Sequence, residues 1–158
     1  MKCRVAVIGY GNPGRGDDAA GPLLAEKAEE WNVPGVRVVS DYQLNVEHAA
    51  DLAESELALF IDAALDAPEP WELRPVLPMN RNDFTTHAML PETVMETCRS
   101  VYGNPPPAFV LAVRGENFEL GVEPSAAFRN RIDSAARLLE EILRAENPAA
   151  VCETHAAG

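Results

Sequence analysis

The chain has 158 residues, 47% of them hydrophobic, which is enough for one substantial core. With 25 acidic against 13 basic residues the net charge is −12, so the surface is expected to repel nucleic acid and anionic membranes. No segment is apolar for long enough to span a bilayer, and no charged-then-apolar leader precedes the first predicted strand. The widely spaced Cys3, Cys98 and Cys152 fit reduced thiols. We therefore expect a cytoplasmic protein without nucleic-acid or membrane partners.

The hydrophobic pattern predicts alternating strands and helices. The first strand, at about 4–9, contains the apolar run Val5–Ile8, which is typical of a strand buried on both faces. Further strands are predicted at about 35–40, 57–61, 72–77 and 108–113. Helices are predicted at about 19–32, 46–54, 91–102 and 124–145, with Cys98 in the apolar stripe of the third. This alternation predicts an α/β sandwich.

One connection indicates a reversed strand. Between Ile61 and Glu72 the chain carries Pro68 and Pro70 and no helical pattern, whereas parallel neighbours need a crossover of about a dozen residues or more. The fourth strand is therefore predicted to be antiparallel. Residues 1–146 are expected to form a single domain, and residues 147–158, which lack periodicity, to form a mobile tail.

The turn after the first strand places two carboxylates at a helix entrance. Its glycine spacing fits a dinucleotide fingerprint, but Pro13 lacks an N–H group, and Asp17 and Asp18 stand where a pyrophosphate would lie. Cations are therefore the expected ligands. The alternative is that Asp17 caps the helix and Asp18 is a solvated residue of its first turn.

Two further residues are candidates for the same site. Asp62 directly follows the apolar strand Leu57–Ile61, and the carboxyl ends of central strands line the ligand crevice of an open sheet. Its alternative is an ordinary turn aspartate. His87 precedes a helix opened by Pro91, and the chain between Pro78 and His87 is long enough to reach that edge. Two carboxylates and an imidazole would form an open site suited to nickel, zinc or manganese.

The other two histidines are weaker candidates. His48 stands beside Glu47 on a short predicted helix, where a surface role is expected. Cys152 and His155 lie in the predicted tail, where a ligand pair is not expected.

Three separated motifs resemble those of the hydrogenase maturation endopeptidases. They are Gly11-Asn12 with Gly16–Lys27, then Phe60–Ala63, then Thr85-Thr86-His87, in that order. The resemblance implies a three-layer α/β/α sandwich with a mixed five-stranded sheet, of the phosphorylase/hydrolase-like kind. It also implies an endopeptidase that removes the C-terminal extension of a nickel-iron hydrogenase large-subunit precursor after nickel insertion.

Carried over by motif, the resemblance makes Asp18, Asp62 and His87 the metal-contacting residues. The first of these is often Glu in relatives. Where many relatives have Asp-Gly-Gly after the second strand, this chain has Asp41 followed by Tyr42-Gln43-Leu44. A bound metal could activate water itself, or nickel could belong to the substrate while Asp41 or Asp17 activates water. We expect the second, with zinc or cadmium able to substitute for nickel.

Two other functions remain open from the sequence. Asn12-Pro13-Gly14 after a strand also resembles the peptidyl-tRNA hydrolases, but the Thr-Arg-His-Asn stretch of that family is absent, and a tRNA substrate favours a basic surface. A noncatalytic nickel-binding scaffold is the alternative outside enzymes.

Overall fold

A computed structural model of the chain describes residues 2–79 and 89–157. Within these residues a five-stranded sheet has the order β2-β1-β3-β5-β4. Its strands are β1 (Val5–Tyr10), β2 (Val36–Asp41), β3 (Ala58–Ala64), β4 (Trp71–Pro75) and β5 (Ala108–Arg114). All neighbours are parallel except β4, which runs antiparallel to β5. The predicted mixed sheet and its reversed fourth strand are confirmed.

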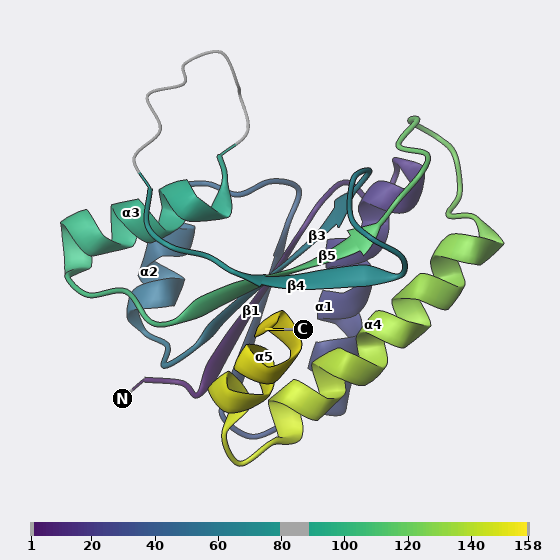
Figure 1. Cartoon of the computed structure of the whole chain (residues 1–158). Helices are drawn as coiled ribbons and strands as arrows, with labels where there is room; N and C mark the ends of the chain where they lie inside the picture. The colour runs from purple at the N-terminus through teal and green to yellow at the C-terminus, as the bar shows by residue number, and fades with distance from the viewer. Residues whose placement is uncertain (1, 80–88, 158) are drawn as a thin grey trace.

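Helices cover both faces of the sheet, so the predicted three-layer α/β/α architecture is also confirmed (Figure 1). One face carries α1 (Ala20–Trp31), α4 (Ala126–Arg144) and α5 (Pro148–Ala157). The other carries α2 (His48–Ala53) and α3 (Pro91–Tyr102). Phe128 of α4 fills the first core, and Phe60 of β3 fills the second. Cys98 is fully buried in the second core, as predicted.

The C-terminal segment corrects the sequence analysis. Residues 147–158 were expected to form a mobile tail, but Pro148–Ala157 is helix α5, which packs against α4 and β4. Cys152 is fully buried in the core on that side of the sheet. The side-chain oxygen of Asn147 accepts a hydrogen bond from the N–H of Ala150 at 3.2 Å, which caps the helix. Asn followed by Pro is a helix-start signal that does not depend on hydrophobic periodicity.

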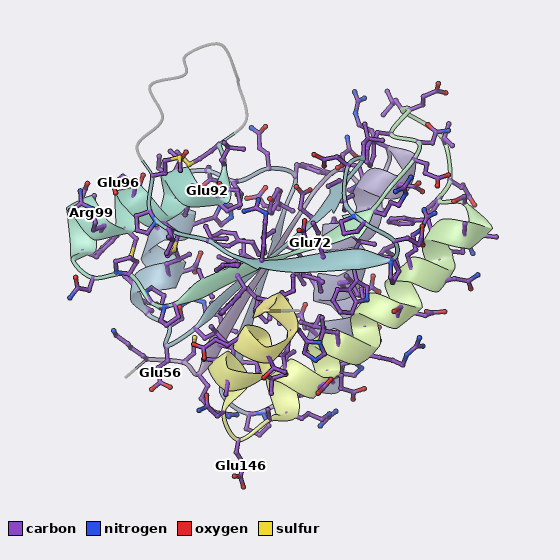
Figure 2. The ribbon with its side chains drawn as sticks, in the orientation of Figure 1. Glu56, Glu72, Glu92, Glu96, Arg99 and Glu146 are labelled. Atoms are coloured by element: carbon purple, nitrogen blue, oxygen red, sulfur yellow. The ribbon has the colours of Figure 1, made fainter. Side chains whose placement is uncertain are left out.

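Acidic residues outnumber basic ones by 25 to 13, and Figure 2 labels several of the glutamates. Among the labelled residues, Glu56, Glu72 and Glu146 are exposed, while Glu96 forms an ion pair with Arg99 on α3. None of the helices in residues 2–79 and 89–157 combines the length and the apolarity that crossing a membrane requires.

Candidate functional site

The candidate site lies at the carboxyl ends of the parallel strands. Tyr10 pairs with Asp41 of β2, and Gly9 pairs with Ile61 of β3, so Asp41, Tyr10 and Asp62 stand in one row across three neighbouring strands. Side chains in one row project from the same face of a sheet. Since strands are spaced by about 4.8 Å, the Cα atoms of Asp41 and Asp62 lie roughly 10 Å apart.

Close packing at glycine positions places the loop between β1 and α1 next to this row of residues. A Cβ atom at Gly21, in the first turn of α1, would collide with the backbone of Tyr10 and lie 2.8 Å from the carbonyl oxygen of Ile61. Only glycine therefore lets α1 start directly against β1 and β3. The short 3-10 helix η1 (Gly16–Ala19), which carries Asp17 and Asp18, precedes α1 and is held at the same edge.

Asp62 is a largely buried carboxyl at the end of β3. Its Oδ1 accepts the N–H of Ala63 at 2.8 Å, and its Oδ2 accepts the hydroxyl of Tyr10 at 3.2 Å. The pKa of Asp62 is raised from 3.8 to about 6: burial raises it most, the two hydrogen bonds lower it, and the charge of Asp18 raises it. The side chain lines a cavity of about 200 Å³, together with Glu72 and Arg74.

Asp18 is the second carboxyl of the site. Its Oδ2 accepts the backbone N–H of Asn12 at 2.8 Å. Burial raises the pKa of Asp18, while that hydrogen bond and the charge of Arg15 lower it. The structure thus brings two of the predicted ligands close enough to affect each other electrostatically. A divalent cation between two such desolvated carboxylates would favour their ionised forms.

The third predicted ligand, His87, lies outside the described residues. Within residues 2–79 and 89–157, no group of three or more His, Cys, Asp or Glu side chains is placed to hold a metal ion. The described chain resumes at Met89, and Leu90 and Pro91 line the cavity into which Asp62 faces. The three-ligand set therefore stays a prediction, with two carboxylates of the set brought together.

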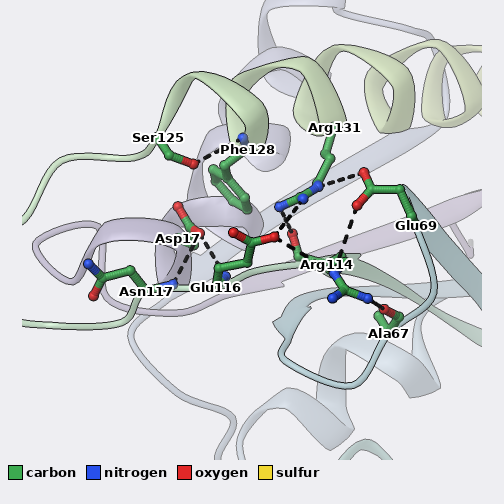
Figure 3. A network of polar contacts seen from close by, with 9 residues as sticks. All are labelled: Asp17, Ala67, Glu69, Arg114, Glu116, Asn117, Ser125, Phe128 and Arg131. Atoms are coloured by element: carbon green, nitrogen blue, oxygen red, sulfur yellow. Dashed lines mark hydrogen bonds and ion pairs between the residues drawn. The ribbon is translucent and has the colours of Figure 1, made fainter.

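Asp17, which was predicted as a candidate for water activation, is buried, and one of its two carboxylate oxygens is occupied by backbone contacts (Figure 3). Its Oδ2 accepts the N–H of Glu116 at 2.8 Å and that of Asn117 at 3.3 Å. Its own N–H donates to the carbonyl oxygen of Asn117 at 2.8 Å. These bonds attach η1 to the loop after β5, so the geometry favours a supporting role for Asp17 and leaves Asp18 to face the site.

A buried arginine also holds the loop after β5 in place. Arg131 of α4 donates from Nε to Glu69 at 2.6 Å and from a terminal nitrogen to Glu116 at 2.8 Å (Figure 3). It thereby joins α4, the β3–β4 connection and the loop after β5. Arg131 was not among the residues predicted from the sequence. Its position beside Ile132, on the apolar stripe of α4, was the available signal.

Asp41 is the more accessible of the two candidates for water activation. Its side chain is 43% exposed and lines a cavity of about 240 Å³ that also contacts Gly11 and Pro13. A carboxylate at the wall of a solvent-accessible cavity can contact both water and substrate. His48, beneath it, is only 3% exposed, so the surface role expected for His48 is wrong.

Cys152 and His155 do not form a ligand site. Burial raises the pKa of Cys152 to about 12, so this thiol stays protonated at neutral pH. The ring of His155 packs at an edge against Trp71, with 6.2 Å between the ring centroids. Both side chains serve the packing of α5 on the sheet.

Comparison with known proteins identifies related structures. No protein-family model matches the chain, and a search of curated proteins found no significant match. Among solved structures, the [NiFe] hydrogenase maturation protease HycI from Thermococcus kodakarensis KOD1 is 26% identical, with a TM-score of 0.71 over 91% of this chain and 94% of that one.

Two Escherichia coli proteins share the fold. The hydrogenase maturating endopeptidase HybD is 20% identical, with a TM-score of 0.71 over 89% of this chain and 92% of that one. The endopeptidase HycI is 21% identical, with a TM-score of 0.66 over 94% of both chains. The common fold spans nearly the full length of each protein, so these comparisons confirm the resemblance: this chain is a structural relative of the hydrogenase maturation proteases and an enzyme of the peptidase class.

Proposed function

We propose that this protein is an endopeptidase that removes the C-terminal extension of a nickel-iron hydrogenase large-subunit precursor after nickel insertion. Asp18, Asp62 and His87 would recognise the nickel that the precursor already carries. The observation that carries the proposal is the pairing of Asp18 with Asp62 at the strand ends of a maturation-protease fold. Nickel is then part of the substrate, and zinc or cadmium can take its place in binding experiments.

The separation of Asp41 from the paired carboxylates supports this division of tasks. A base that acts on water bound to the same ion must lie within hydrogen-bond reach of that water. Asp41 stands two strands away from Asp62, about 10 Å between Cα atoms. A nickel-recognition group and a separate water-activating group fit this spacing better than a single hydrolytic metal centre does.

In the proposed reaction, the Asp41 carboxylate accepts a proton from water while the water oxygen attacks the scissile carbonyl carbon. The carbon–nitrogen bond then breaks, and the proton passes to the leaving amine. Tyr10 does not enter the reaction. Its hydroxyl donates to Asp62, so that this hydroxyl and the N–H of Ala63 each occupy one lone pair of the carboxylate and leave the others to a cation.

The decisive experiment uses metal-stripped protein and precursor that either carries or lacks nickel. Metal-free enzyme should shorten the loaded precursor at a normal rate, and added zinc should not rescue the unloaded one. Cleavage of nickel-free precursor by zinc-loaded enzyme would instead establish a conventional metallopeptidase. Stable binding of loaded precursor without loss of its extension would support a noncatalytic scaffold.

Variants separate recognition from cleavage. Asp62→Asn and His87→Ala should weaken binding of nickel, zinc or cadmium in calorimetry, since a neutral amide or a methyl group is a poorer partner for the cation. Asp41→Asn should bind loaded precursor normally and slow its cleavage. Asp133→Asn, at an exposed position of α4, is the matched control and should change neither. Metal binding unchanged by both site variants would refute the assignment.

A further inference from the structure

His48, the first residue of α2, has a fixed proton position. Its Nδ1 accepts the backbone N–H of Asn45 at 2.9 Å. A backbone N–H can only donate, so Nδ1 carries no proton, and the proton of the neutral imidazole sits on Nε2. The ring is 3% exposed, so it cannot contact a substrate directly.

The protonated nitrogen of His48 faces Asp41. Nε2 lies 3.6 Å from Oδ2 of Asp41, and the side-chain amide of Asn45 donates to the same oxygen at 3.4 Å. The other oxygen, Oδ1, accepts the N–H of Tyr42 at 2.8 Å. Two hydrogen bonds and the nearby Nε2 of His48 thus flank a carboxylate that still opens onto a solvent-accessible cavity. At 3.6 Å the contact between Nε2 and Oδ2 is longer than a hydrogen bond, and such contacts between catalytic groups often shorten in the substrate complex.

The segment before α2 holds His48 in place. The side-chain oxygen of Asn45 accepts the N–H of Glu47 at 2.9 Å, and its backbone carbonyl accepts the N–H of His48 at 3.2 Å. Leu44 is buried in the core between the sheet and α2–α3. These contacts follow the position where the chain departs from the Asp-Gly-Gly pattern. They fix the orientation of the imidazole through the backbone of this segment.

We propose that His48 is a positioning residue that orients the carboxylate of Asp41 for water activation. The inference rests on the proposed function, in which Asp41 is the group that accepts the proton from water. The hydrogen bond from Asn45, together with an Nε2–H group that comes within hydrogen-bond distance in the substrate complex, restricts rotation of the carboxylate at the wall of the cavity. Correct orientation of a catalytic group contributes strongly to rate, because misplacement by about 1 Å can cost roughly 100-fold.

Nitrogen NMR of the isolated protein tests the proton position without reference to activity. The His48 imidazole should show a protonated Nε2 and an unprotonated Nδ1. A protonated Nδ1, or rapid exchange between the two tautomers, would overturn the proposed orientation.

Single-turnover cleavage of nickel-loaded hydrogenase large-subunit precursor tests the role. His48→Leu, which fills the space without a donor, should slow cleavage by about 10- to 100-fold while leaving precursor binding unchanged. His48→Gln places an amide donor near the position of Nε2 and should retain most of the rate. His155→Leu is the matched control on α5 and should cleave like the wild type.

A double-mutant comparison separates positioning from general loss of structure. In an Asp41→Asn background, His48→Leu should slow cleavage no further, since the group that it orients is already gone. Additive losses, or a His48→Leu variant as fast as the wild type, would refute the positioning role. Failure of the wild type to shorten the loaded precursor would refute the proposed function instead. Thermal unfolding of each variant shows whether the fold is kept.

Discussion

Replacing Asp62 by Asn should make the protein more stable at neutral pH. Burial raises the pKa of Asp62 from 3.8 to about 6, so the folded state holds a proton that the unfolded state has lost over that interval. Stability therefore falls as the pH rises from about 4 to about 6, and the full cost of ionising the buried group is present above that. Asparagine keeps the shape and has no charge to ionise.

The expected size of the effect follows from the same pKa. A rise from 3.8 to about 6 corresponds to a cost of about 3 kcal/mol at pH 8. For a chain of 158 residues, a gain of this size raises the midpoint of thermal unfolding by about 6–12 °C. As the pH falls through 3.8 the unfolded state also becomes protonated, so the difference between wild type and variant should be small at pH 4 and vanish well below it.

Urea unfolding at pH 8 and pH 4, with a chelator present, measures this difference. The chelator matters because a bound cation would stabilise the wild type through its charged carboxylate. Asp133→Asn, on the exposed face of α4, should stay within about 0.5 kcal/mol of the wild type at both pH values. A gain for Asp62→Asn that is absent at pH 8, or equal at both pH values, would refute the reasoning.

Three further outcomes are expected. Tyr10→Phe should raise the pKa of Asp62 further, because the lost hydroxyl stabilised its ionised form; a carboxyl NMR titration that gives a lower pKa would contradict this. Gly21→Ala should destabilise the fold by about 1–3 kcal/mol in urea unfolding and weaken zinc binding, since the new methyl group displaces the start of α1; an unchanged protein would show that the packing is looser. Removing residues 147–158 should lower the thermal midpoint by exposing the core under α5, and an unaltered midpoint would favour the mobile tail that the sequence predicted.

Much of the fold was predictable because its signals are local. The apolar run Val5–Ile8 identified a strand buried on both faces, and the proline-containing connection after Ile61 identified the reversed strand β4. Helix α5 was missed because its apolar residues do not follow a helical stripe, so only the tertiary packing of Cys152 shows which side it buries.

The candidate site was also predictable from the sequence only in part. The sequence by itself placed Asp18 and Asp62 at the ends of elements that meet at one edge of the sheet, since strand order and polarity follow from the connections. It could not show that Asp17 is bonded to the loop after β5, because the partners of Asp17 lie about a hundred residues further along the chain. The buried position of His48 against Asp41 and the contacts of Arg131 likewise depend on which surfaces come together. Hydrophobic periodicity and turn-forming residues depend only on residues that are close together in the sequence. Hydrogen bonds between distant segments form only once the core has brought those segments together.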